Sequence, residues 1–183
     1  MQHPPHIHES TVIKAGQGER SAQADLYRYY GKAMYNICIR MTGSAADAQD
    51  VFQDAFIDAF RHLGQLKQPG AFAGWLRRIM INKCIQFSRS HVRWSSLDEE
   101  GSEPAADHET AWWLNIPLDL VQEEIKNLPG GCREVFVLYA LEDFPHKEIA
   151  GNLGISESTS KSQYQRARKL LRDRITKQMH LNG

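Results

Sequence analysis

Hydroxyl, amide and cationic side chains recur at helical spacing near the C-terminus, in residues 155–174. In a helix, Ser160, Tyr164, Ala167 and Leu171 would lie on one inner face, and the other polar groups would point outward. Hydroxyls and amides can hydrogen-bond to base edges in the major groove of DNA, and cations can hold its phosphates. The outward residues are Ser158, Lys161, Ser162, Gln165 and Lys169, flanked by Arg166 and Arg168. We favour a DNA-binding helix over a solvated basic helix.

The residues before this helix predict the element that would hold it in place. Residues 144–171, FPHKEIAGNLGISESTSKSQYQRARKLL, have the pattern of a helix-turn-helix. Pro145 suits the first turn of the first helix, and Gly154 can adopt the left-handed conformation that the turn needs. Ser156 can cap the second helix. Such a motif places its second helix in the major groove, which agrees with the chemistry of the outward side chains.

A second mixture of groups, aromatic, amide and guanidinium, follows a loop formed by Gln68, Pro69 and Gly70. These groups suit unpaired bases, because an aromatic ring stacks on a base, an amide recognises its edge and cations hold phosphates. The candidates are Phe72, Trp75, Arg77, Arg78, Asn82 and Lys83. Packing of Phe72 and Trp75 in a hydrophobic core is the other interpretation, which these two residues taken alone favour.

Residues 42–64 form the clearest predicted helix, with Thr42 or Ser44 as its N-cap and Gly64 at its end. One face would be apolar and buried, and it carries Phe52, Phe56, Phe60 and Leu63. Another face carries a row of carboxylates, Asp47, Asp50, Asp54 and Asp58. Such a row is either solvated or docks on a basic protein surface, since it would repel DNA.

The composition offers little support for an enzyme, a metal protein or a membrane protein. No phosphate-binding loop, nucleophile motif or metal-ligand spacing is present, so we expect no catalytic residues, no metal and no cofactor. Cys38, Cys84 and Cys132 lie far apart, and buried free thiols are the simplest expectation. No apolar run approaches the roughly 20 residues of a membrane span, and no signal-peptide pattern opens the sequence. We therefore expect a cytoplasmic protein.

Helical periodicity runs through most of the chain and almost no strand pattern appears, so we predict an all-α fold. Acidic and basic residues number 22 each, yet residues 97–110 carry Asp and Glu but no Lys or Arg, and this acidic segment separates two basic ones. This polar stretch, broken by Gly and Pro, predicts a flexible linker between two small helical domains. The predicted parts are a flexible tail over 1–17, a first domain over 18–93, the linker over 94–116 and a second domain over 117–179.

In combination, the segments DAQDVFQDAFIDAF and FAGWLRRIMINKCI, the acidic linker and the helix-turn-helix resemble the bacterial extracytoplasmic-function (ECF) sigma factors, the minimal group of the sigma-70 family. The resemblance covers residues 22–175. It implies a protein that binds core RNA polymerase and directs promoter-specific transcription, with sigma region 2 in the first domain and region 4 in the second. Core polymerase (its β′ clamp helices and β flap), promoter DNA and an anti-sigma factor would be the partners.

The resemblance also assigns residues to these partners. The β′ clamp helices would bind Asp47, Asp50, Gln53 and Asp54. The melted −10 element would be captured by the loop from Leu66 to Gly70 together with Phe72, Trp75, Arg77, Arg78, Asn82 and Lys83. The outward face of the second helix would recognise the −35 element as duplex DNA. Its residues would be Ser158, Thr159, Lys161, Ser162, Gln165, Arg166 and Lys169. A helix-turn-helix regulator that acts without core polymerase is the alternative, but it leaves the carboxylate row and the mixed surface unexplained.

Two features depart from the family pattern. Ser160 occupies a position where these proteins usually have a buried aliphatic residue, and its hydroxyl needs a partner such as the carbonyl one turn back. Trp112 and Trp113 stand just before region 4, and two adjacent tryptophans are rarely left in water. They would cap the core of region 4 or dock onto another protein.

Overall fold

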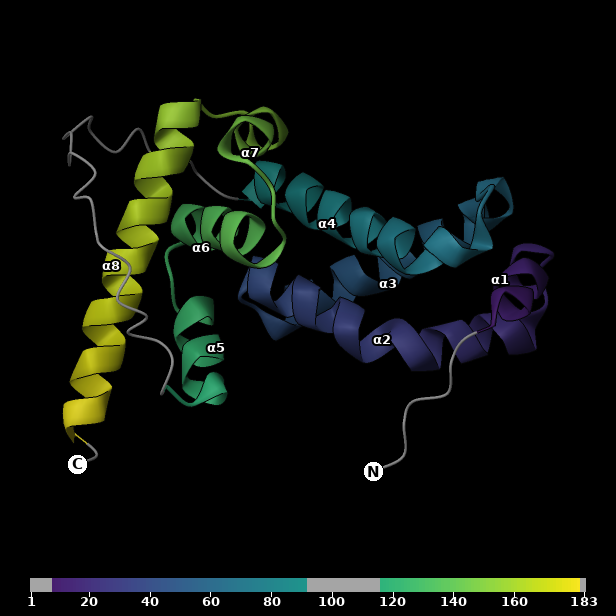
Figure 1. The fold of residues 1–183 in the computed structure, drawn as a ribbon, viewed down its shortest axis with the longest axis horizontal. Coiled ribbons are helices and arrows are strands. Elements are labelled where there is room, and N and C mark those ends of the chain that lie inside the picture. The colour runs from purple at the N-terminus through teal and green to yellow at the C-terminus, as the bar shows by residue number, and fades with distance from the viewer. Residues whose placement is uncertain (1–7, 92–115, 182–183) are drawn as a thin grey trace. The chain divides into compact units, whose positions relative to one another are not determined.

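The computed structural model describes residues 8–91 and 116–181, and the regular elements within those ranges are all helical (Figure 1). The helices divide between two compact units, Met1–Ile39 with Ser44–Phe87, and Arg40–Gly43 with Ser88–Gly183. The prediction of an all-α protein with two helical domains is confirmed. Residues 94–115 of the predicted linker, with Trp112 and Trp113, lie outside the described residues.

The first unit is built on four helices around an aromatic core. The helices are α1 (Glu9–Gly16), α2 (Arg20–Thr42), α3 (Ala45–His62) and α4 (Phe72–His91), with short 3-10 turns at Leu63–Gln65 and Pro69–Ala71 between α3 and α4. Phe52 and Phe56 of α3 are buried and lie against Tyr27 of α2 in edge and tilted contacts. Ser44 is the N-cap of α3, and its hydroxyl accepts from the Asp47 backbone N–H. The predicted helix and its apolar face are therefore present.

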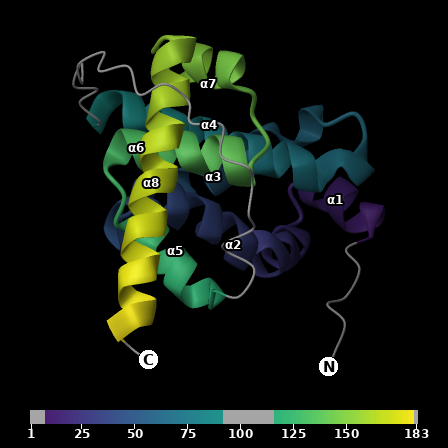
Figure 2. The ribbon, with the colours of Figure 1, turned by 60° about the vertical axis from the view of Figure 1, so that its left-hand side comes forward.

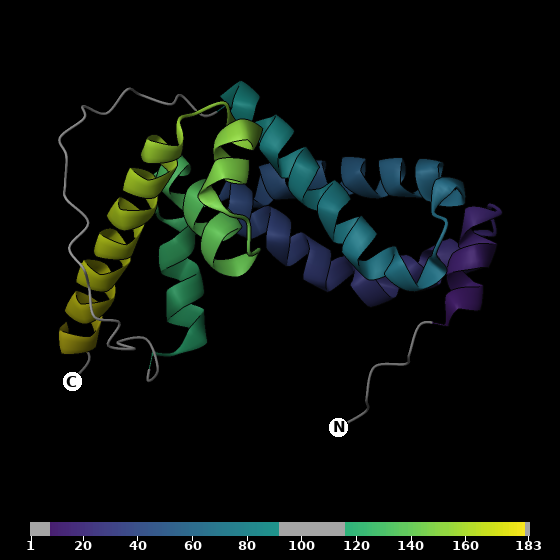
Figure 3. The same cartoon turned by 45° about the horizontal axis from the view of Figure 1, so that its top comes forward.

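The N-terminal segment corrects the predicted tail. Residues 9–16 form α1, because Val12 and Ala15 supply an apolar stripe that becomes buried. This stripe packs on the two 3-10 turns that join α3 to α4, and Figure 3 shows α1 beside that connection. Gly64 lies in the first of these turns, where a Cβ atom would come within 3.5 Å of the Gly16 carbonyl oxygen. A helix thus supports the loop to which the sequence assigns nucleic-acid contacts.

The second unit packs three short helices against one long one. These elements are α5 (Leu118–Lys126), α6 (Gly130–Phe136), a π-helical turn (Val137–Leu141), α7 (His146–Leu153) and α8 (Glu157–Leu181). Figure 2 shows α8 in yellow running across α6 and beside α5, and its contacts with α5, α6 and α7 build the core. Val135, Leu138 and Ile149 are fully buried there, as are Leu171 and Ile175 of α8.

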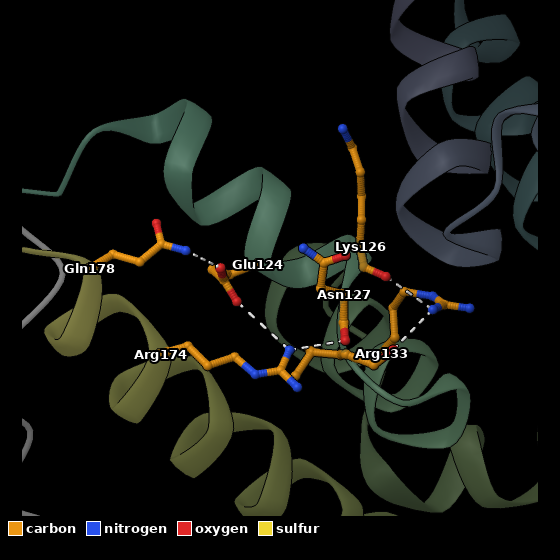
Figure 4. Close-up of polar contacts among 7 residues, drawn as sticks. Glu124, Lys126, Asn127, Arg133, Arg174 and Gln178 are labelled. Atoms are coloured by element: carbon orange, nitrogen blue, oxygen red, sulfur yellow. Dashed lines mark hydrogen bonds and ion pairs between the residues drawn. The ribbon is translucent and has the colours of Figure 1, made fainter. Parts of the chain in front are cut away.

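A buried carboxylate ties the last turns of α8 to α5 (Figure 4). Glu124 is 5% exposed and accepts a hydrogen bond of 2.7 Å from the side-chain amide of Gln178. The Arg174 guanidinium lies 3.7 Å from the same carboxylate and donates to the Asn127 carbonyl oxygen at 2.9 Å. We call Glu124, Arg174 and Gln178 the carboxylate clamp. It compensates the cost of burying a charge by pairing it.

Candidate nucleic-acid interface

The helix-turn-helix has the local geometry that its sequence predicts. Gly154 follows α7 with φ +72°, a left-handed conformation that glycine adopts without a steric penalty. The Ser156 hydroxyl accepts from the Thr159 backbone N–H at 3.0 Å and so caps α8. Pro145 stands at the N-cap of α7, one position before the helix, and not in its first turn. The turn therefore presents the first half of α8 at the surface of the unit.

The outward face of α8 carries the residues that the sequence predicts for contact with duplex DNA. Those exposed are Ser158, Lys161, Ser162, Gln165, Arg166 and Lys169, and Thr159 is half-buried. Lys161 pairs with Glu157 at 2.7 Å, and this hydrogen bond holds the pKa of the Glu157 carboxyl below its usual range. Arg168 is half-buried, with its guanidinium carbon 5.8 Å from the centre of the Tyr164 ring. The exposed set combines donors, acceptors and cations on one helix face.

The inner face of α8 holds more polar groups than the sequence suggests. Gln163 is only 7% exposed, and the Cys132 thiol of α6 lies 2.9 Å from its side-chain oxygen. Ser160 is fully buried, and its hydroxyl meets Nδ1 of His146 at 2.9 Å, where the sequence suggested a backbone carbonyl. Two buried polar contacts therefore fix α8 to its neighbours, one to α6 and one to α7. All three cysteines are buried free thiols, as predicted.

A cavity of about 290 Å³ opens on the first unit between α3 and α4. It is lined by Asp58 and His62 from α3 and by Trp75, Ile79, Asn82, Lys83 and Gln86 from α4. This volume is at the lower end for ligand pockets, about 300 Å³, and suits a group of the size of one nucleobase. Of the seven residues predicted for the unpaired strand, the structure brings three together here: Trp75, Asn82 and Lys83.

One wall of this cavity is an ion pair that the sequence did not predict. The Lys83 ammonium lies 2.5 Å from one oxygen of the Asp58 carboxylate, and Arg61 lies 3.1 Å from the other. The hydrogen bond from Lys83 lowers the pKa of Asp58 below its ordinary value. One small cavity thus combines the Lys83–Asp58 ion pair, the exposed amide of Asn82 and the half-buried ring of Trp75.

The other predicted residues of this surface lie outside the cavity. Phe72 is 1% exposed and packs on Tyr30 at 5.3 Å between ring centres, so its ring is part of the core and offers no face to a base. Leu66 is half-buried between the two 3-10 turns, and Arg78 is exposed on α4 beside Trp75 and Asn82. Arg77 is half-buried and does not line the cavity.

The carboxylate row of α3 keeps most of its members on one surface. Asp50, Gln53 and Asp54 are exposed, and Asp47 is half-buried in the first turn. Ile57 continues this surface and is 54% exposed, so an apolar side chain adjoins the acidic ones. Ile57 stands three residues after Asp54 and seven after Asp50, so the helical repeat places it on the carboxylate face and away from Phe56. An acidic surface with an apolar neighbour is suited to a protein partner that carries basic residues.

Comparisons with known proteins agree with this arrangement. Residues 26–93 match the model of sigma-70 region 2, and residues 118–171 match that of sigma-70 region 4. The chain is 31% identical over 176 residues to the ECF RNA polymerase sigma factor SigE of Mycolicibacterium smegmatis, covering 91% of this chain and 68% of that protein. It is 30% identical over 176 residues to SigW of Bacillus subtilis, covering 90% and 94%.

Among solved structures, CnrH in complex with the cytosolic domain of CnrY is 27% identical, with a TM-score of 0.49 and coverage of 90% and 94%. None of the helices in the described part of this chain combines the length and hydrophobicity that crossing a bilayer requires. The matches to both sigma regions do not favour the alternative, a helix-turn-helix regulator that acts without core polymerase. This chain belongs to the ECF RNA polymerase sigma factors of the sigma-70 family, which bind core polymerase and direct transcription from promoters.

Proposed function

We propose that the two surfaces divide promoter recognition between them. The outward face of α8 takes the −35 element as duplex, and the cavity between α3 and α4 takes an unpaired base of the −10 element. The observation that carries this proposal is the convergence of Trp75, Asn82 and Lys83 on one cavity. In domain terms, region 2 spans residues 18–93 with α1 packed on it, the linker spans 94–116, and region 4 spans 117–179.

In the cavity each side chain has a separate task. The Trp75 ring stacks on the base, which is worth about 1–3 kcal/mol for an exposed aromatic platform. The Asn82 amide offers one donor and one acceptor, so it discriminates bases by their edges. Lys83 and the neighbouring Arg78 hold phosphates of the displaced strand. Phe72 supports Trp75 from the core, with 6.0 Å between their ring centres.

On α8 the exposed residues approach the major groove. Lys161, Gln165 and Arg166 contact base edges, because ammonium, amide and guanidinium groups match the donors and acceptors displayed there. The Ser162 hydroxyl already donates to the Thr159 carbonyl at 3.0 Å, so it is left to contact the DNA as a hydrogen-bond acceptor. Ser158, Thr159 and Lys169 extend the same face toward the phosphates.

The acidic surface of α3 completes the proposal. Asp47, Asp50, Gln53 and Asp54 dock on the β′ clamp helices of core polymerase, and region 4 contacts the β flap. The exposed Ile57 adds apolar area to the first of these contacts. An anti-sigma factor restrains the protein, which works in the cytoplasm with the polymerase. The sigma factor positions the polymerase on the promoter, supplies binding energy and performs no catalysis of its own.

The decisive experiment compares Asn82→Ala with the wild type on two templates. The templates carry a promoter mapped from transcripts made by core polymerase with this protein. Asn82→Ala retains core binding and forms about tenfold fewer open complexes on the native promoter, within the 1–3 kcal/mol of a base contact. On a template already mismatched at the −10 element it recovers part of that loss, but no longer discriminates the exposed base. Permanganate footprinting reports both outcomes.

Asn36→Ala is the matched control, because Asn36 is an exposed amide on α2 that does not line the cavity. It behaves as the wild type on both templates. If Asn82→Ala melts the native promoter normally and keeps its base preference, Asn82 does not contact the base and the cavity is not the −10 site.

A further inference from the structure

A buried hydroxyl in the recognition helix is bound by the first helix of the same motif. Ser160 of α8 has 0% of its surface exposed, so its hydroxyl cannot turn to water. Nδ1 of His146, the first residue of α7, lies 2.9 Å from it. A buried hydroxyl without a partner would cost roughly 1–3 kcal/mol. The His146–Ser160 contact therefore supplies the partner that this buried hydroxyl needs.

The imidazole of His146 is itself held in a fixed orientation. Its ring stacks on Tyr139 of the π-helical turn, with 4.1 Å between centres and 10° between planes. Tyr164 of α8 contacts both rings, at 4.6 Å from Tyr139 and 5.8 Å from His146. Two tyrosine side chains from two other elements thus restrict the imidazole before it meets the hydroxyl. The stack sets the direction of Nδ1, and Nδ1 sets the position of Ser160.

We propose that His146 is a positioning residue for −35 recognition, which fixes the rotation of α8 about its axis through the Ser160 hydroxyl. Lys161 is the next residue along the helix, and Gln165 and Arg166 follow within two turns. A rotation of α8 about its axis moves all three base-contacting groups together. This proposal rests on the proposed function, since α8 must be the recognition helix for its orientation to matter.

The test uses holoenzyme reconstituted from core polymerase and full-length variants. The readout is the ratio of affinities for the mapped promoter and for a copy with a scrambled −35 element. Ser160→Ala and His146→Phe each lower this ratio about fivefold, the net worth of one hydrogen bond of roughly 1 kcal/mol. The double variant loses no more than either single variant, because both remove one contact. His146→Asn keeps an amide that can donate to or accept from the Ser160 hydroxyl and retains the wild-type ratio.

Cys132→Ala is the matched control, because it removes the contact of α8 with α6 at Gln163 and leaves that with α7 intact. Thermal melts establish that each variant is folded at the assay temperature. The proposal is overturned if Cys132→Ala lowers the ratio as much, or if the losses of the two single variants multiply in the double variant. Lys161→Ala distinguishes failure of the proposed function from failure of the positioning role. If Lys161→Ala leaves the ratio unchanged, α8 is not the recognition helix. If it lowers the ratio while the His146 and Ser160 variants behave as the wild type, only the positioning role is rejected.

Discussion

Single polar residues inside the second unit are buried where a specific partner reaches them. Ser160 meets His146, Gln163 meets Cys132, and Glu124 meets Gln178. Each contact joins α8 to a different helix, α7, α6 and α5 in turn. Apolar packing alone tolerates small rotations and shifts, whereas a hydrogen bond fixes direction as well as distance. These contacts attach α8 to three neighbouring helices, and we assign the direction of its exposed face to the contact with α7.

The His146 contact makes the stability of the protein depend on pH in one direction. Burial lowers the pKa of His146, and Lys161 lowers it further, while Glu157 opposes this effect. Lys147 on α7 and the two tyrosines of the stack are the other titratable neighbours. The ordinary pKa of histidine is about 6.5. The neutral ring therefore stabilises the fold above that pH, and this contribution is lost as the pH falls through the lower folded-state pKa.

We expect the melting temperature of the wild type to fall more steeply below pH 6.5 than that of His146→Phe, by differential scanning calorimetry. The other titrating groups are common to the two proteins and cancel in the difference between their curves, except Glu157, whose pKa His146 helps to lower. Parallel curves would show that His146 titrates as it does in the unfolded chain.

At the scale of elements, α8 is longer than the region that defines its family. The match to region 4 ends at residue 171, but α8 continues to Leu181. The additional turns have few buried apolar residues, with Ile175 the main one within the described part of the chain. An unsupported helix end of this kind frays. The carboxylate clamp anchors these turns to α5, which explains how they persist.

Replacing Arg174 with Met removes one arm of the clamp and leaves Glu124 with a single partner on α8. We expect a loss of about 1–3 kcal/mol of stability and faster amide hydrogen exchange in residues 172–181. The first half of α8 should keep its protection, because His146 and Cys132 still hold it. Lys126→Ala is the control, since its ion pair with Glu123 is largely exposed and such pairs contribute about 0–1 kcal/mol. Equal effects of both variants would contradict the role of the clamp.

Elements with strong local signals could be predicted from the sequence, and those that depend on tertiary contacts could not. The Ser44 cap, the Gly154 turn and the Ser156 cap act within a few residues, so their helices were predicted correctly. Helix α1 was missed because its apolar stripe is only two buried residues, which gain stability from the 3-10 turns they cover. Its N-terminal position and the preceding His-Pro segment pointed instead to a loose tail.

The same division applies to the candidate site. The residue types of Trp75, Asn82 and Lys83 predict stacking, edge recognition and phosphate binding. Asp58 and His62 of the same cavity come from α3, and their proximity to α4 depends on the fold, so it could not be predicted from the sequence. Taken alone, Phe72 favours the core, whereas the resemblance assigns it to the unpaired DNA strand, and its burial supports the core. The partner of Ser160 could not be predicted either, since His146 precedes it by 14 residues across a turn.

At the scale of the whole molecule, a chain with no net charge presents surfaces of opposite sign. Exchange of Asp50 and Asp54 for Lys reverses the sign of the α3 surface while leaving its buried aromatic face intact. We expect this double variant to keep its circular dichroism spectrum and to lose core polymerase in a pull-down, because attraction to a basic partner becomes repulsion. Glu19→Lys with Asp25→Lys changes the net charge equally at exposed sites away from α3 and should still bind. Core binding by the folded Asp50 and Asp54 variant would exclude this surface as the docking site.

The ion pairs of Lys83 with Asp58 and of Lys161 with Glu157 also bear on how promoter binding responds to ionic strength. A cation that arrives at DNA unpaired drives the release of condensed counterions, and each such cation steepens the fall of affinity with salt. On the proposed assignment, Lys83 and Lys161 would each leave a carboxylate of their own chain to meet the DNA, and that carboxylate would stay tethered beside it. The attraction of each ammonium to the DNA would therefore be weakened at every salt concentration. We expect the logarithmic salt slope of promoter binding to be shallower than the number of proposed DNA-facing cations implies.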